Sequence, residues 1–308
     1  MENVVERGST SLVDDVSKSF QSSEIILDSF HIIWDRLCRE VGFHFPITSA
    51  LNEMKHLVLY EALDGSRSTL GSYRERDRGV QSALYALHLI HVLKMLGAQT
   101  CFIMVHTAYN RNRGEDEFHD ILCSIEDGAP LIRRYAVQNH VQCSCICANE
   151  NHELQSLFKE ITDATRGGVF QSIFLFDYTE EWAMTDRGRE IVETFPDIDV
   201  HIRHTKFQFS GGWIPGKMAH STFLYSQNGS TYSNWRSDEI VVLASLSLLT
   251  KLLHSGEGLT KIYRNEEEIR HRYELREIKL FNKVIMLQDS PRKLFMMGSP
   301  TGVYQFYY

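Results

Sequence analysis

The feature that most constrains the fold is a regular alternation of short apolar segments with longer amphipathic ones. Strands that alternate with helices at this spacing form βαβ units. The sequence therefore predicts an α/β fold with a central, mainly parallel sheet flanked by helices on both faces. Buried strands are predicted at 55–63, 99–107, 141–148, 170–178 and 198–205, with a sixth expected at 221–226. Helices are predicted at 22–41, 79–98, 115–140, 151–168, 184–195 and 237–253, where apolar residues recur at helical spacing.

Composition divides the chain into three parts. Residues 1–22 are polar and rich in serine, which is typical of a flexible tail. Residues 23–260 hold the predicted strands together with an N-terminal helix and are expected to form one domain. Residues 261–308 begin highly charged and end in aromatic residues. This C-terminal extension is expected to be either a closing hairpin or an arm that contacts a second subunit.

Charge and hydropathy argue against three classes of protein. The 308 residues carry a formal net charge of −8, whereas a protein that binds nucleic acid presents a basic face. No apolar run approaches the roughly 18 residues needed to cross a membrane, and the first 20 residues lack the apolar stretch of a secretory signal. Cys143, Cys145 and Cys147 alternate along one segment, which suits a buried, reduced strand face and not a zinc site. We therefore expect a cytoplasmic protein.

Polar clusters follow four of the predicted strands. Ligands of such sheets bind beyond the carboxyl ends of the strands, so these clusters are expected to share one edge. Arginine is abundant in them, and guanidinium groups pair with phosphate oxygens in a bidentate manner. The sequence thus favours a small, multiply charged anion, above all a diphosphate. The clusters are Asp64, Arg67, Arg74, Arg76 and Arg78; Asn110, Arg111 and Arg113; Tyr178, Glu180 and Glu181; and Arg203 with Lys206.

Each cluster also has a simpler interpretation. Asp64 and Arg67 could neutralise each other at the surface, and residues 73–78 have the composition of a solvated, charged loop. The acidic pair at 180–181 suits the first turn of a helix, where the helix dipole favours negative charge. His88 and His91, one turn apart, are predicted to share a helix face and not to bind zinc.

The order and spacing of the clusters resemble the cis-prenyltransferase superfamily, the undecaprenyl-diphosphate-synthase-like enzymes. The family motif D-G-N-R-R-W corresponds to D-G-S-R-S-T at residues 64–69. The motif S-T-E-N-W-x-R-P-x-x-E corresponds to residues 107–117, where Asn110, Arg113 and Glu117 match the family residue. Both motifs directly follow predicted strands, as they do in the family.

Two further motifs strengthen the resemblance. The family motif N-Y-G-G-R corresponds to D-Y-T-E-E at residues 177–181, and D-x-x-I-R-T-x-G-E corresponds to D-V-H-I-R-H-T-K-F at residues 199–207. The resemblance covers about residues 55–255. It implies a cis-prenyltransferase fold, a catalytic domain within residues 23–260, and a homodimer.

The departures from the family motifs point to one branch. Ser68 and Thr69 replace the second arginine and the tryptophan of the first motif, and Phe207 replaces the glutamate that helps to bind magnesium and diphosphate in chain-elongating members. The subsite for a second diphosphate is therefore expected to be lost. This pattern resembles the divergent terpene-synthase branch represented by tuberculosinol synthase, whose members ionise one prenyl diphosphate.

The predicted activity is that of a terpene synthase acting on a linear prenyl diphosphate of roughly farnesyl to geranylgeranyl length. Diphosphate would leave, and the product would be a terpene alcohol or hydrocarbon. Two alternatives are a cis-prenyltransferase that condenses two prenyl diphosphates and a non-catalytic partner subunit. The hydrocarbon tail is expected between the sheet and the helices at 80–96 and 117–138.

The residues of the predicted site divide by role. Arginines would neutralise the leaving diphosphate, with backbone N–H groups assisting. Asp64 would either bind Mg²⁺ together with the diphosphate or orient the arginines, and Mg²⁺ is the one candidate cofactor. The predicted diphosphate-binding residues are Gly65, Ser66, Arg67, Ser68, Arg113 and Arg203. The predicted catalytic residues are Asp64, Asn110 and Tyr178, the last as an aromatic group near a cation.

Overall fold

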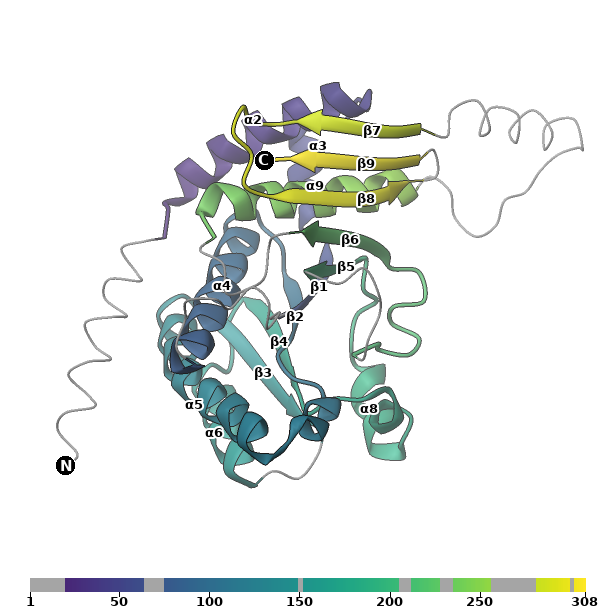
Figure 1. Cartoon of the computed structure of the whole chain (residues 1–308). Helices are drawn as coiled ribbons and strands as arrows, with labels where there is room; N and C mark the ends of the chain where they lie inside the picture. Colours follow the sequence, from purple (N-terminus) through teal and green to yellow (C-terminus); the bar gives the residue numbers. More distant parts are fainter. Residues whose placement is uncertain are drawn as a thin grey trace, which may run out of the picture.

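A single sheet organises the computed structural model of the chain (Figure 1). The structure describes residues 20–63, 75–148, 152–204, 212–227, 235–255, 281–299 and 302–308. Within them, nine strands are ordered β3-β4-β2-β1-β5-β6-β8-β9-β7. The strands are β1 (Val58–Ala62), β2 (Thr100–Met104), β3 (Val141–Cys147), β4 (Phe170–Phe176), β5 (Val200–His204), β6 (Thr222–Gln227), β7 (Phe281–Met286), β8 (Leu294–Ser299) and β9 (Gly302–Tyr307).

Helices cover both faces of this sheet. Figure 1 shows α4, α5 and α6 on one side of the parallel strands and α8 on the other. The predicted α/β fold with a flanked, mainly parallel sheet is confirmed. None of the described helices is long and apolar enough to cross a membrane. The helices are α2 (Ser23–Val41), α3 (Ile47–Met54), α4 (Glu75–Met95), η2 (Ala108–Arg113), α5 (Glu115–Gln138), α6 (His152–Ala164), α7 (Glu180–Ala183), α8 (Asp186–Glu193) and α9 (Ser237–Ser255).

Strand β1 lies at the centre of the parallel part of the sheet. It pairs with β2 on one side and with β5 on the other, and all pairs from β3 to β6 are parallel. Successive β1 side chains point to opposite faces. Leu59 packs in the larger core with helices α4 and α9, whereas Tyr60 and Ala62 pack in the smaller core, which contains residues of α7 and α8. Glu61 therefore points to the face of the larger core.

The C-terminal segment continues the sheet. Strand β8 runs antiparallel to β6 and to β9, and β7 pairs in parallel with β9. Arg36 of α2 donates hydrogen bonds at 2.8 Å to the carbonyl oxygens of Met286 and Leu287, just where β7 ends. The sequence had left a hairpin and an intersubunit arm open for this region, and its described residues form a β8–β9 hairpin joined to the main sheet.

The boundaries of the predicted helices are mostly confirmed. Ser22 caps α2 and accepts a hydrogen bond from the N–H of Ile25, while Gly42 ends the helix with a φ of 74°. One prediction was wrong: α4 begins at Glu75, so residues 75–78 are helical and not part of a loop. Arginine and glutamate are good helix formers, and the high charge of this segment concealed that preference.

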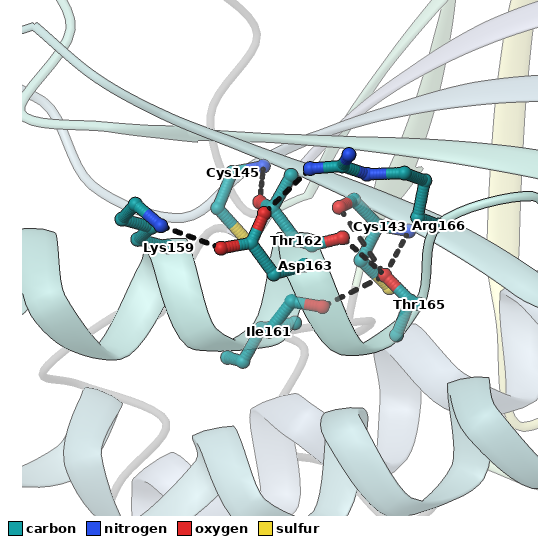
Figure 2. Close-up of polar contacts among 8 residues, drawn as sticks. All are labelled: Cys143, Cys145, Lys159, Ile161, Thr162, Asp163, Thr165 and Arg166. Carbon is teal, nitrogen blue, oxygen red and sulfur yellow. Dashed lines mark hydrogen bonds and ion pairs between the residues drawn. The ribbon is translucent and has the colours of Figure 1, made fainter.

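Thr162 of α6 and Thr165, which directly follows α6, cover the edge of the sheet at β3, as Figure 2 shows. The N–H of Cys143 donates to Oγ1 of Thr165 at 3.0 Å, and the N–H of Cys145 donates to Oγ1 of Thr162 at 3.2 Å. An edge strand otherwise presents unpaired backbone groups. Burial raises the pKa of the Cys145 thiol to about 12, and none of the six cysteines, all of which the structure describes, forms a disulfide. The predicted strand is confirmed, with Cys143 buried and Cys145 and Cys147 partly buried.

Replacing Thr165 with valine should lower the free energy of unfolding by about 1–3 kcal/mol, because the N–H of Cys143 would lose its acceptor in a buried position. The side chain of Thr165 is nearly isosteric with valine, and the residue is 4% exposed. Urea unfolding followed by circular dichroism measures the change. Thr194→Val is the control, because Thr194 is exposed and its hydroxyl bonds only to the carbonyl of Ile191. Equal stability of the two variants would contradict this prediction.

Candidate active site at the carboxyl edge of the sheet

The structure describes only part of the predicted site. Residues 64–69, which hold the first motif, lie outside the described residues, and so do Lys206 and Phe207. Arg113 belongs to η2, but its side chain is not described. The framework around them is defined: β1 ends at Ala62, between the carboxyl ends of β2 and β5. The predicted site residues with described side chains are Asn110, Tyr178 and Arg203.

Asn110 shapes the segment after β2. Its Oδ1 accepts hydrogen bonds from the N–H and the hydroxyl of Thr107, at 3.3 and 2.8 Å. These contacts form a capping arrangement at the start of η2. Asn110 thus positions the backbone that leads to Arg113.

Tyr178 lies beside this segment, after β4. Its backbone forms a parallel bridge with Thr107, the residue whose N–H and hydroxyl donate to Asn110. The ring is fully buried, and its hydroxyl donates to the carbonyl of Trp213 at 2.9 Å. Burial, reinforced by the charge of Glu180, raises the pKa of Tyr178. The phenol therefore stays neutral at physiological pH.

Arg203 stands apart from that pair, on β5. It is 3% exposed and lies in register with Tyr225 of β6. Strand β1 separates β5 from β2, so about 10 Å, two interstrand spacings, divides Arg203 from the β2 end. Because Glu61 is in register with Ile202, Arg203 lies level with Ala62, two residues before Asp64.

A buried carboxylate at the end of β4 was not singled out from the sequence. Asp177 is 3% exposed, with a φ of 53°, and both of its oxygens accept hydrogen bonds from Arg111, Nε at 3.1 Å. Its N–H donates to Nδ1 of His106 at 3.2 Å. The Arg111 guanidinium also lies 5.0 Å from the ring centroid of Phe118. This cluster fixes a half-exposed arginine at the carboxyl edge of the sheet.

The acidic pair after Tyr178 occupies the first turn of α7, as the simpler interpretation predicted. Thr179 caps the helix and accepts from the N–H of Trp182 at 3.1 Å. Glu180 accepts from the N–H of Trp213 at 3.0 Å, and Glu181 accepts from the hydroxyl of Tyr109 at 3.0 Å. The two carboxylates thus connect α7 to η2 and to the segment that begins at residue 212.

Glu61 is the second side chain that reasoning from the sequence missed. It is fully buried in β1, and its Oε1 lies 2.5 Å from Nε2 of His204 at the end of β5. The hydroxyl of Tyr85, on α4, lies 3.1 Å from the same nitrogen. The sequence did contain a signal for Glu61, because a parallel strand that is buried on both faces normally has a continuous apolar sequence and a glutamate interrupts it.

His201, two residues before Arg203, should make the stability of the protein depend on pH. His201 is 1% exposed, between the rings of Tyr60 and Phe223, and burial followed by the charge of Arg203 lowers its pKa to about 3. In the unfolded chain this histidine titrates near pH 6.5. The unfolded state then binds more protons, so stability is full above about pH 6.5 and falls by about 1.4 kcal/mol per unit as the pH decreases toward the folded pKa.

His201→Leu should therefore reduce the loss of stability between roughly pH 6 and pH 5 by about 1.4 kcal/mol. Urea unfolding at several pH values measures it. His31→Leu, an exposed position on α2, should leave the loss unchanged. Burial, followed by the charge of His91, lowers the pKa of His88 to about 4. His88 should therefore leave a residual dependence of stability on pH in every variant. An unchanged slope in His201→Leu would show that the residue is protonated in the folded state.

The described residues show no metal-binding cluster. No group of three or more histidine, cysteine, aspartate or glutamate side chains among them could hold an ion. His88 and His91 instead share a face of α4, as expected, and His91 hydrogen-bonds to the hydroxyl of Tyr135 at 2.8 Å and to the carbonyl of Gln21 at 3.0 Å. Asp64 remains the candidate Mg²⁺ ligand, outside the described residues.

Comparison with known proteins finds similar structures but no similar family model or curated sequence. No protein-family model matches the chain, and no curated protein matches it in sequence. Among solved structures, lavandulyl diphosphate synthase from Lavandula x intermedia, in complex with dimethylallyl diphosphate, aligns with a TM-score of 0.55 and 14% identity, over 64% of this chain and 96% of that one. A probable undecaprenyl diphosphate synthase from Campylobacter jejuni aligns with a TM-score of 0.48 and 12% identity, over the same shares. The chain therefore has the cis-prenyltransferase fold that its motifs indicated.

Proposed function

We propose that the protein is an enzyme that binds a linear prenyl diphosphate at the carboxyl edge of its sheet and ionises it, as a terpene synthase. The leaving diphosphate would be held by Arg67, Arg113 and Arg203, with backbone N–H groups of residues 65–68. Preorganised donors on a leaving group supply several kcal/mol of transition-state stabilisation. The product would be a terpene alcohol or hydrocarbon.

One observation carries the proposal: the motif Asp64-Gly65-Ser66-Arg67 follows directly on the central strand β1. The chain leaves β1 toward β2 and leaves β5 in the opposite direction, toward β6. Ligands of open α/β sheets bind where the connections diverge in this way. Strand β1 thus ends at the switch point, next to the strand that carries Arg203, and the motif begins two residues further along the chain.

Loss of a second diphosphate subsite favours ionisation of one substrate over condensation of two. Phe207 stands where chain-elongating relatives have a glutamate, and Ser68 stands where they have a second arginine. A phenyl ring has no oxygen atom with which to coordinate a Mg²⁺ ion bound to a diphosphate. Mg²⁺ would be held at Asp64, where it would neutralise charge on the diphosphate.

Condensation of two prenyl diphosphates is the second candidate function. It is favoured by the likeness to lavandulyl diphosphate synthase, a structure that contains dimethylallyl diphosphate. The two candidates differ in whether a second prenyl diphosphate is consumed, which an assay can measure directly.

The deciding experiment offers geranyl, farnesyl and geranylgeranyl diphosphate singly to the purified protein, each with and without Mg²⁺. Parallel reactions add isopentenyl or dimethylallyl diphosphate. Released diphosphate and extractable products are measured. Turnover of one diphosphate alone is the expected result. Turnover only with an added five-carbon diphosphate would replace the proposal with the second candidate, and no turnover in any combination would favour a non-catalytic partner subunit.

A further inference from the structure

A carboxylate is buried in the apolar face of the central strand, close to the proposed substrate. Glu61 is fully buried, and its register partners on the neighbouring strands are Ile103 and Ile202. It precedes Asp64 by three residues, a distance that the chain can extend to at most about 10 Å. Its side chain points toward α4, the helix that bounds the face where the hydrocarbon tail is expected.

The surroundings of Glu61 form one connected set. His204 and Tyr85 hold its carboxylate: Nε2 of His204 lies 2.5 Å from Oε1, and burial, followed by the charge of Glu61, raises the pKa of Tyr85. The ring of Trp235 packs against both, with centroid distances of 5.5 Å to His204 and 5.1 Å to Tyr85. Glu61, Tyr85 and His204 come from β1, α4 and β5, and Trp235 lies just before α9, so the fold itself assembles the set.

Stability alone does not explain this arrangement. Burying a carboxylate carries a desolvation penalty of several kcal/mol, and a buried ion pair is often no more stable than apolar side chains of similar volume. A leucine at residue 61 would match its isoleucine neighbours in the sheet. Ionisable groups that are buried and held by specific partners at the edge of a site are frequently functional.

We infer that Glu61, positioned by His204 and Tyr85, is the base that completes the reaction after ionisation. This inference rests on the proposed function. The carbon–oxygen bond of the substrate breaks, both electrons leave with the diphosphate, and an allylic cation remains. A negative charge in an apolar surrounding stabilises that cation more strongly than it would in water.

Glu61 can complete the reaction of the cation in two ways, and in both it accepts one proton. In the first, a lone pair of a water molecule forms a bond to the cationic carbon, and one proton of that water moves to the Glu61 carboxylate, which gives an alcohol. In the second, Glu61 takes a proton from the carbon next to the cation, and the electrons of that carbon–hydrogen bond form a double bond. The protonated carboxyl loses its proton to solvent after product release.

The test compares Glu61→Gln with Asp199→Asn. Asp199 is a matched control, because it also joins β1 to β5, accepting from the N–H of Val58 at 2.8 Å and pairing with Lys251 at 3.0 Å, but at the opposite end of the strands. The test uses the prenyl diphosphate that the unsubstituted protein converts. Its turnover is expected to fall about 100-fold in Glu61→Gln, a typical effect of removing a general base. It is expected to stay within about threefold of the unsubstituted protein in Asp199→Asn.

A binding measurement separates this inference from the proposed function. Calorimetry would follow a prenyl ammonium, a stable mimic of the cation, in the presence of inorganic diphosphate. Affinity is expected to fall at least about tenfold in Glu61→Gln and to stay unchanged in Asp199→Asn. Unchanged affinity in Glu61→Gln, or no binding by the unsubstituted protein, would overturn the inference whether or not turnover is found. An inactive protein that binds the ammonium through Glu61 would overturn the proposed function and the role of Glu61 as a base, and would leave Glu61 as a cation-binding group only.

A milder variant keeps the test decisive if Glu61→Gln does not fold, as circular dichroism would show. Tyr85→Phe removes only the hydroxyl that contacts His204. Its turnover is expected to fall about tenfold with KM unchanged, because it disturbs the position of the base and not the binding of substrate. Unchanged kcat in this variant, or a change confined to KM, would overturn the positioning role.

Discussion

Replacing Arg67 with alanine should slow the release of diphosphate from a prenyl diphosphate by about 100- to 1,000-fold, with little effect on stability. Charge develops on the leaving oxygens as the carbon–oxygen bond breaks, and a guanidinium that donates two hydrogen bonds stabilises that charge more than it stabilises the bound substrate. Asp64→Ala should have an effect of similar size if the carboxylate holds Mg²⁺. Steady-state assays of diphosphate release measure both variants.

Arg76→Ala is the control for Arg67→Ala. Arg76 lies only nine residues away in the sequence, within the first turns of α4, and the sequence indicates that it is solvated. Its replacement should change the rate less than about threefold. Equal losses in the two variants would mean that net positive charge, and not a specific contact, promotes the reaction. An unchanged rate in Arg67→Ala would remove this arginine from the site.

Replacing Gly79 with alanine should destabilise the protein by about 2–3 kcal/mol, because it forces α4 away from α5. A Cβ atom at residue 79 would lie 1.9 Å from the backbone oxygen of Ser124. Gly128 of α5 continues the contact, since a Cβ atom there would lie 3.1 Å from the backbone oxygen of Gly79. Backbone atoms cannot move aside as a flexible side chain can. The clash should outweigh the roughly 1 kcal/mol that alanine gains over glycine within a helix.

Urea unfolding of Gly79→Ala measures this loss against Gly298→Ala. Gly298 lies on β8, and nothing lies within 4 Å of the position that a Cβ atom would occupy there. That control should differ from the unsubstituted protein by less than about 0.5 kcal/mol. A Gly79→Ala protein as stable as the control would show that the two helices can separate without loss. Their contact would then place no limit on the space available to a hydrocarbon tail.

The fold class could be predicted from the sequence, because the spacing of apolar residues within a short segment is enough to indicate a strand or a helix. Apolar runs such as 99–107 and 170–178 gave β2 and β4, and alternation with amphipathic helices required parallel pairing, since parallel strands need a long crossover connection. The start of α4 was placed too late, because the charged residues 75–78 were interpreted as a loop. A high density of charged residues indicates that a segment is exposed to solvent, but it does not distinguish an exposed helix from an exposed loop.

The sequence by itself determined which strands would carry polar residues at their ends, because each motif directly follows a strand along the chain. It placed Asn110 and Tyr178 in clusters expected to share one edge of the sheet, and in the structure the backbone of Tyr178 forms a bridge with Thr107, three residues before Asn110. Only the tertiary structure decided what those side chains contact: Asn110 caps η2, and the Tyr178 hydroxyl bonds to Trp213. The pairing of Glu61 with His204, 143 residues away in the chain, was beyond reach of any local pattern. Contacts of that kind arise because β1 and β5 are neighbours in the sheet, and strand order is set by how helices pack over its faces and not by the sequence of either strand.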